Sequence, residues 1–324
     1  MAISATVLTG CIEEIFPENS TATSEQIGAS ASALEAAING LPSQMVQGYL
    51  VYGKQVHETD IAYPSLMLAQ SELLGDIVAT EYGYDWWWRY SANNSMGDNS
   101  YQSFLPYFSL YKFVKSANDV IAVVDVTDPT ISDEMRGYGS MAHAFRALDY
   151  YTLMVLFEPM ENIYTDCSNV LGLTVPIVTE ATTNDMAKNN PRATHEEMMT
   201  FILSDLDKAE IGLADYTPAT KNFPSLAVVY GLKAKVYMWD KNYSKAAEYA
   251  RKAIDASGAT PMTAAQWNNS TTGFNTATSS WMWYLHPTAS NMGNLANFIG
   301  HISNEAGWGY ADLSKLQIAR SLYD

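Results

Sequence analysis

Apolar residues recur at helical intervals near the start of the chain. Ile27, Leu34, Ile38 and Leu41 are spaced seven, four and three residues apart, so they share one face of a helix. Gly40 stands where this apolar face ends and is expected to terminate the helix. The pattern therefore predicts one amphipathic helix in this region.

Two further helices are expected in the part of the chain that follows. The first covers residues 43–58. The second begins near Pro64, because the fixed φ of proline suits a first helical turn, and its apolar positions are Leu66, Leu73, Leu74, Ile77 and Val78. Residues 82–100 then break the periodicity, since they are polar, rich in Gly and Asn, and contain three consecutive tryptophans. We expect them to form a long loop or a loop with a short strand, and ordered loops of this length are usually functional.

Helical spacing resumes beyond this segment and carries clear start signals. Asp133 and Glu134 fall in the first turn of one expected helix, where negative charge is favourable. Thr194 and Glu197, three residues apart, predict a capping box at the start of another. The helices expected here cover residues 103–125, 132–157, 194–213, 225–239 and 244–257, the last of them closed by Gly258.

The helix pair over residues 225–257 resembles a tetratricopeptide repeat. Tyr237, Tyr243, Ala246 and Ala253 occupy the spacing of that repeat's aromatic and small positions. Small alanines let two antiparallel helices approach, while the tyrosine rings fill the groove between them. After Gly258 the chain is rich in Thr, Ser, Asn, Trp and Gly without a helical period.

The sequence therefore predicts a mostly α protein. Residues 24–324 are expected to form a single domain, with a tetratricopeptide-like helical-repeat scaffold at about 103–258. A loop-rich, partly β ligand-binding region is expected at 259–324.

Charge and composition narrow the classes of ligand. Eighteen Lys and Arg stand against 35 Asp and Glu, for a formal net charge of −17, so a phosphate backbone is repelled and nucleic acid is not an expected partner. Aromatic residues make up 12% of the chain, with 21 Tyr and 8 Trp. Rings that stack and also hydrogen-bond suit neutral polar ligands such as sugars, although a Tyr-rich helical core would give the same composition. The chain contains no apolar run long enough for a membrane-spanning helix.

The start of the chain resembles the end of a bacterial lipoprotein signal. Leu8-Thr9-Gly10-Cys11 fits the lipobox pattern, which predicts lipidation at Cys11, a signal peptide remnant at 1–10 and a tether at 11–23. The alternative is that Cys11 is an ordinary thiol. A complete signal has a charged segment and a longer apolar segment, and we expect that the start is clipped. With Cys11 lipidated, Cys167 has no disulfide partner and is expected to be a small buried residue.

Four segments resemble the SusD/RagB family of outer-membrane nutrient-binding lipoproteins of Bacteroidetes, and they occur in the family's order. They are RALDYY at 146–151, GLTVPIVT at 172–179, PRAT at 191–194 and YGLKAKVY at 230–237. The resemblance implies a lipid-anchored protein at the cell surface that passes oligosaccharide to a SusC-like TonB-dependent transporter. Family members usually continue beyond the point where this chain stops, so a C-terminal part of the fold is expected to be missing.

The candidate ligand contacts are aromatic and amide side chains. A pyranose presents C–H faces to aromatic rings, while its hydroxyls need amide donors and acceptors. The predicted contacts are Trp86, Trp87, Trp88, Tyr90, Asn93 and Asn94, with Trp283 and Trp308 as further candidates. Two of the three consecutive indoles could instead anchor the loop. Trp281 and Trp283 would share one side of a strand, where core packing is the alternative to ligand contact.

Enzyme motifs are largely missing from the sequence. It contains no G-x-S-x-G, phosphate-binding loop, dinucleotide fingerprint or H-E-x-x-H, so no catalytic residue, cofactor or metal ligand is predicted. A surface glycoside hydrolase with two distant carboxylates stays a third hypothesis. The leading prediction is a non-catalytic glycan-binding lipoprotein. The alternatives are a peptide-capturing RagB-like lipoprotein and a tetratricopeptide adaptor that binds only protein.

Overall fold

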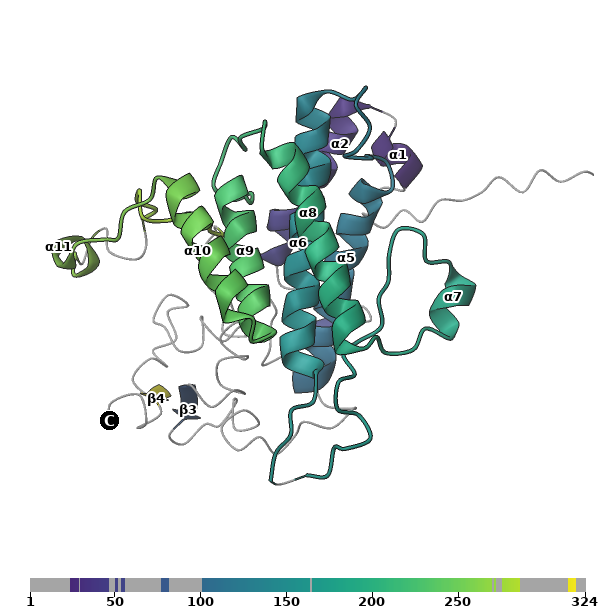
Figure 1. Ribbon diagram of the computed structural model, residues 1–324, viewed down its shortest axis with the longest axis vertical. Coiled ribbons are helices and arrows are strands. Elements are labelled where there is room, and N and C mark those ends of the chain that lie inside the picture. The colour runs from purple at the N-terminus through teal and green to yellow at the C-terminus, as the bar shows by residue number, and fades with distance from the viewer. Residues whose placement is uncertain are drawn as a thin grey trace, which may run out of the picture.

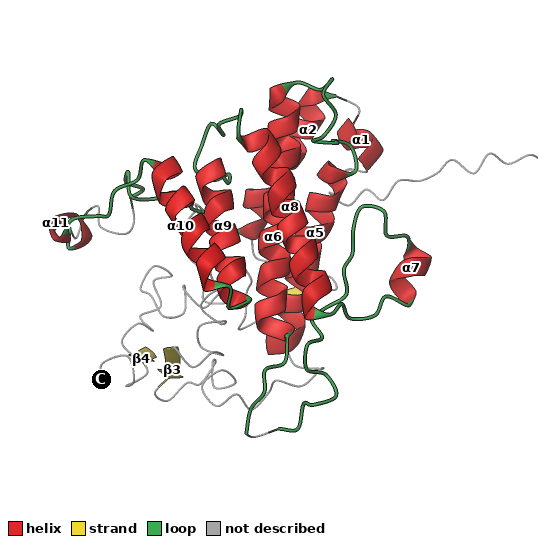
Figure 2. Cartoon of the chain, viewed as in Figure 1, coloured by secondary structure: helices red, strands yellow, loops and turns green. Residues whose placement is uncertain are grey.

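The long helices of the protein stand side by side with similar axis directions (Figure 1). This computed structural model describes residues 24–28, 30–46, 50–51, 54–55, 77–81, 101–163, 165–269, 271, 276–285 and 314–318. Helices make up most of the regular structure in this part of the chain (Figure 2). The prediction of a mostly α protein is confirmed.

Helix α6 (Asp133–Phe157) forms the centre of the bundle. It starts where the Ser132 hydroxyl accepts a hydrogen bond from the Met135 N–H, with Asp133 and Glu134 in the first turn. Because it is buried along nearly its whole length, its apolar residues are not confined to one stripe. The elements packed against it are α2 (Ala31–Met45), α5 (Tyr101–Ile121), α8 (His195–Leu213) and α9 (Leu226–Trp239).

The remaining helices lie around this core. Helix α10 (Tyr243–Ser257) packs against α9, and α1 (Ser24–Gly28) packs against α2 and α5. The short helices α7 (Asn184–Lys188) and α11 (Ala264–Trp267) lie in segments that project from opposite sides of the bundle (Figure 1). The capping box of Thr194 and Glu197 is present at the start of α8, and Gly258 ends α10 with a left-handed φ of 60°. Both predicted signals are confirmed.

The α9–α10 pair has the contacts between small and aromatic residues that are expected of a tetratricopeptide-like unit. One tyrosine in the groove differs from the predicted one. Ala246 and Ala253 are buried against α9. Tyr237 stacks on Tyr249, with ring centroids 5.5 Å apart. Tyr243, which was predicted to fill this groove, is 62% exposed, because it is the first residue of α10. Tyr249, two turns further along, takes its place.

Three expectations for the N-terminal segment are wrong. Gly40 does not end its helix, since α2 continues to Met45 and buries Leu41 in the added turn, so packing outweighs the low helix propensity of glycine. Residues 43–58 do not form a helix, because β1 (Leu50–Val51) pairs antiparallel with β2 (Lys54–Gln55).

The third error is at the end of the helix predicted from Pro64. Ile77 and Val78 belong to strand β3 (Ile77–Glu81), which pairs antiparallel with β4 (Ser314–Ile318) in the register Ile77↔Ile318 to Glu81↔Ser314. The partner of this strand is more than 230 residues away in the sequence, so no local pattern could reveal it.

Gly212 allows α6 and α8 to approach closely. Its N–H donates to the Ser140 hydroxyl at 3.1 Å, and a Cβ at this position would lie 2.6 Å from the Arg136 carbonyl oxygen. Gly40 is the opposite case, since a Cβ there would meet no atom within 4 Å. A methyl group would therefore overlap α6 at Gly212 and would fit without contact at Gly40.

We expect Gly212→Ala to lower the free energy of unfolding by about 1–3 kcal/mol, because overpacking a rigid helix crossing forces the backbones apart. The matched change Gly40→Ala should raise it by roughly 0.5–1 kcal/mol, since alanine is the better helix former. Denaturant melts of both variants measure the difference. Equal stability of the two variants would contradict the close approach of α6 and α8.

A carboxyl group is buried within α6 away from any ion pair. Asp149 is 1% exposed, and its Oδ1 has no hydrogen-bond partner. Burial raises the pKa of this carboxyl well above its usual range. The folded protein therefore holds a proton at Asp149 at a pH at which the unfolded chain has already lost it.

This raised pKa gives stability a definite pH dependence. The contribution of Asp149 to the free energy of unfolding is fully present below the pKa of the unfolded chain, about 3.9. It is lost as the pH rises through the pKa of the folded protein. Asp149→Asn, which cannot ionise, should be more stable than the wild type at pH 8 and close to it at pH 4. Thermal melts across this range, with the exposed Asp215→Asn as the control, test the expectation. A constant difference at all pH values would rule it out.

Candidate functional site

Most of the predicted ligand contacts lie outside the described residues. These are Trp86, Trp87, Trp88, Tyr90, Asn93, Asn94 and Trp308, and the predicted lipidation site Cys11 lies outside them as well. Among the predicted contacts, Trp283 is described, and it belongs to a segment that crosses the bundle surface after α10. The geometry of the candidate site is therefore built from this segment.

Residues 281–284, which we call the clasp, are tied to the turn between α8 and α9. The Trp283 indole N–H donates to the Asn222 carbonyl at 2.9 Å, and the Tyr284 N–H donates to the Lys221 carbonyl at 3.1 Å. The Lys221 Nζ in turn donates to the Trp281 carbonyl at 2.5 Å. These three bonds fix the clasp across the start of α9. No local pattern marks Lys221 or Asn222, because their partners in the clasp lie about 60 residues later in the chain.

Trp283 packs against the core, as the alternative interpretation predicted. Its ring meets Phe145 of α6 nearly edge-on, with centroids 5.5 Å apart and an interplanar angle of 67°. It is nevertheless half-buried and lines a pocket. Its role as a ligand contact stays a prediction. The predicted strand with Trp281 and Trp283 on one side is wrong, since residues 281–285 form no strand and the two tryptophans line different pockets.

The first pocket, here the α9 groove, has a volume of about 610 Å³ and a mainly apolar wall. It lies between the end of α2, α6, α9 and the clasp. Gly231 leaves room in its wall, because a Cβ there would meet no atom within 4 Å. Trp283 and Tyr284 contribute aromatic rings, and Lys235 contributes an ammonium group. Such a wall can hold a ligand with C–H faces and a few hydroxyls.

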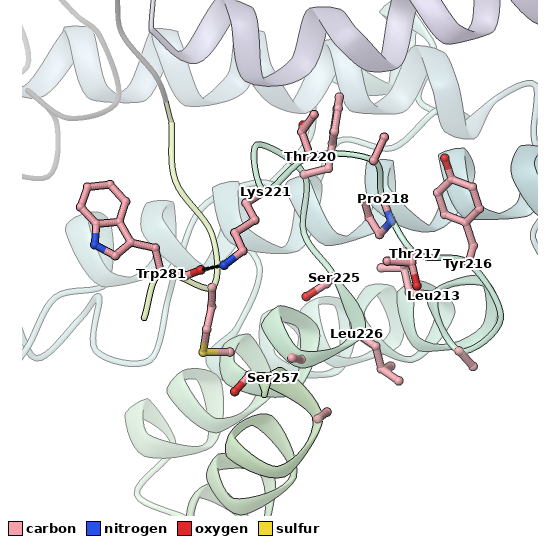
Figure 3. Close-up of a pocket in the computed structure, with 16 residues that line it drawn as sticks. Leu213, Tyr216, Thr217, Pro218, Thr220, Lys221, Ser225, Leu226, Ser257 and Trp281 are labelled. Atoms are coloured by element: carbon pink, nitrogen blue, oxygen red, sulfur yellow. Dashed lines mark hydrogen bonds between the residues drawn. The ribbon is translucent and has the colours of Figure 1, made fainter. Parts of the chain in front are cut away.

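The second pocket, here the α8–α10 pocket, has a volume of about 530 Å³. It lies between the turn after α8, the first turn of α9 and the last turn of α10 (Figure 3). Met282 lines both pockets, so the clasp forms a wall shared between them. Both volumes fall in the range usual for small-molecule sites.

Arg146, in the first of the four motifs, lies at the centre of a buried charge network. Arg146 binds Asp205 through two parallel hydrogen bonds of 2.8 Å, and each side chain is 2% exposed. The Arg146 Nη1 also donates to Asn118 Oδ1 at 2.7 Å and to Glu180 Oε2 at 2.6 Å, and His143 Nδ1 lies 2.7 Å from Asp205 Oδ1. Four of the five N–H donors of the Arg146 guanidinium are therefore engaged in these hydrogen bonds.

The pKa values of the two carboxyls keep this network charged at neutral pH. Burial alone would raise the pKa of Asp205, but the hydrogen bonds from Arg146 and His143 hold it below its usual range. The pKa of Glu180 is lowered in the same way, with hydrogen bonding to Arg146 outweighing the effect of burial. Arg146 and the two carboxylates therefore tie α6, α8 and the connector together through buried ion pairs.

The extended connector at 173–180 is held by side chains of two motifs, those at 146–151 and 191–194. The Tyr150 hydroxyl accepts from the Val178 N–H at 2.7 Å and lies 2.9 Å from the Val178 carbonyl oxygen. Arg192 donates to the carbonyls of Leu173, Thr174 and Phe157 at 2.6 to 3.0 Å. The motifs at 146–151 and 191–194 therefore both contact the motif at 172–179 directly.

Three features of the described residues bear on metal binding, membrane crossing and thiol chemistry. These residues contain no group of three or more His, Cys, Asp and Glu arranged to hold a metal ion. None of the helices described is long and apolar enough to cross a membrane. Cys167 is a free thiol, and it is half-buried in a surface loop rather than buried as predicted.

Comparisons with solved structures give the fold. A SusD-like carbohydrate binding protein from Bacteroides vulgatus is 17% identical, with a TM-score of 0.61, and the match covers 78% of this chain and 50% of that one. A SusD superfamily protein from Bacteroides thetaiotaomicron is 21% identical, with a TM-score of 0.60 and coverage of 80% and 53%. A laminarin binding SusD-like protein is 16% identical, with a TM-score of 0.51 and coverage of 72% and 45%. The chain spans about half the length of these structures.

Comparison with family models gives the family. A search of curated proteins finds no match to this chain. A SusD-like family model, described as starch-binding and associating with the outer membrane, matches residues 42–238. This range contains the four motifs and the buried network, so the resemblance inferred from the sequence is confirmed. The chain belongs to the SusD-like family.

Proposed function

We propose that this protein is a non-catalytic glycan-binding lipoprotein of the cell surface. The observation that carries the proposal is the match of residues 42–238 to a family described as starch-binding and associating with the outer membrane. A laminarin binding protein among the similar structures supports a glycan as the ligand.

The ligand is proposed to lie on aromatic rings and amides. Trp86, Trp87, Trp88, Tyr90, Asn93 and Asn94 form the primary contact, because stacked rings and amide groups together satisfy both the C–H faces and the hydroxyls of a sugar. Trp308 and Trp283 are proposed to extend this surface. The α9 groove beside Trp283 supports this part of the proposal, since it combines aromatic rings with an ammonium group.

The proposed setting is the outer membrane. Lipidation at Cys11 would anchor the chain through the tether at 11–23, and a SusC-like TonB-dependent transporter would receive the oligosaccharide. Peptide capture is the second candidate within the same family. The tetratricopeptide adaptor is less well supported, because the outward face of α10 carries Lys245, Glu248 and Lys252 paired with one another and not an apolar groove.

Affinity electrophoresis against starch, laminarin and other polysaccharides tests the proposal. The wild-type protein should be retarded by at least one polymer. The variant Trp86→Ala/Trp87→Ala/Trp88→Ala should bind at least about tenfold more weakly, since three stacked rings at about 0.5–1.5 kcal/mol each together contribute more than the 1.4 kcal/mol of a tenfold change. Trp267→Ala, which removes a 58% exposed indole on α11, is the matched control.

Each outcome separates the hypotheses. Retardation that survives the triple change would remove the consecutive tryptophans from the site. Binding of peptides with no retardation by any polymer would favour the peptide-capturing branch. Release of reducing ends from a polymer by the purified protein would show a hydrolase and end the non-catalytic proposal.

A further inference from the structure

The α8–α10 pocket has a lining that differs from the rest of the protein. Sixteen residues line it (Figure 3), and none of them is Asp or Glu, although the chain has 35 acidic residues and a formal net charge of −17. Lys221 is the one charged side chain in this lining. A cationic ligand would therefore find no counter-charge here, and a neutral ligand is not repelled.

Hydroxyl groups make up the polar part of the pocket. They belong to Tyr216, Thr217, Thr220, Ser225 and Ser257. Ser257 is already engaged at the end of α10, where its hydroxyl donates to the Ile254 carbonyl at 2.9 Å. The hydroxyls of Thr217, Thr220 and Ser225 make no hydrogen bond to a described residue, and Ser225 does not cap α9 although it stands at its N-cap position. Each hydroxyl can both donate and accept, which suits the hydroxyls of a sugar.

Apolar side chains form the complementary wall. Phe223 and Leu226 line the pocket beside the hydroxyl groups, and Met282 of the clasp closes one end. In Figure 3 the Trp281 indole is directed away from Ser225. The backbone carbonyl oxygen of Trp281 accepts a hydrogen bond from the Lys221 Nζ. The indole instead packs edge-on against Tyr284, with centroids 5.7 Å apart. The C–H face of a ligand would therefore rest on Phe223 and Leu226 and not on the indole.

Lys221 is fixed in place by the clasp. Its Nζ uses one of three N–H donors on the Trp281 carbonyl, and its backbone carbonyl accepts from Tyr284. The ammonium group is thus held at the rim with donors left over. A volume of about 530 Å³ is enough for a small sugar and too small for a long polymer segment.

We infer that the α8–α10 pocket is a second carbohydrate subsite, which takes one or two neutral sugar units at the end of a chain or branch. Its residues are distinct from the aromatic segment at 86–94 and from Trp283 and Trp308. The inference rests on the proposed glycan binding, and it adds a site built by the helical scaffold itself.

Filling the pocket from α10 tests the inference. Ala256 is exposed and lines the pocket, so Ala256→Trp places an indole in the space of the ligand without disturbing the core. Ala247 is exposed on the same helix outside the lining, and Ala247→Trp is the matched control. Both variants, the wild type and the Trp86→Ala/Trp87→Ala/Trp88→Ala variant are compared by affinity electrophoresis in starch and in laminarin, with polygalacturonate as an acidic polymer.

The expected result is that Ala256→Trp weakens retention by the neutral polymer at least threefold, while Ala247→Trp retains the wild-type affinity. If circular dichroism shows that Ala256→Trp is misfolded, Thr217→Val/Thr220→Val removes two hydroxyls at nearly constant shape and should give the same loss. Equal retention of the wild type and the pocket variants, with retention lost in the triple tryptophan variant, would overturn this inference and leave the proposed function standing. A wild type that no polymer retards would overturn both. Retention by polygalacturonate that is lost in Ala256→Trp would overturn the assignment to a neutral sugar.

Discussion

The buried ion pair between Arg146 and Asp205 is the constraint on which the rest of the structure depends. Taking a guanidinium and a carboxylate out of water costs several kcal/mol per ion, and the cost is offset only when every remaining donor and acceptor is satisfied. Here that requires α5 to supply Asn118, α8 to supply Asp205, and the connector to supply Glu180. These elements must therefore assemble around α6 in one arrangement, and a shifted register would leave a charge buried without a partner.

This constraint changes what the family match says about function. Three motif residues on which the resemblance rests, Arg146, Tyr150 and Arg192, satisfy the network or hold the connector. Their polar groups are engaged in these hydrogen bonds. These motif side chains therefore support the fold. A scaffold of this kind can stay the same while the loops that it carries differ in what they bind.

The sequence predicts the parts of the fold that carry their own local signals. The start of α6 at Ser132, the capping box of Thr194 and Glu197, and the left-handed Gly258 are each determined within a few residues, and each was predicted. Gly40 misled because a propensity of about 1 kcal/mol is smaller than the gain from burying Leu41 and Met45 in one more turn. Strand β3 was missed because its hydrogen bonds go to β4, at the other end of the chain.

The same distinction applies to the candidate site. The sequence predicts Trp283 as a site residue because of its aromatic type. It does not predict Lys221 and Asn222, because they act through hydrogen bonds to a segment about 60 residues later. Those bonds place Met282 in the wall of both pockets. A shift of the clasp would therefore change the α9 groove and the α8–α10 pocket together. Because Met282 belongs to both walls, the bonds of Lys221 and Asn222 to the clasp determine the shape of both pockets.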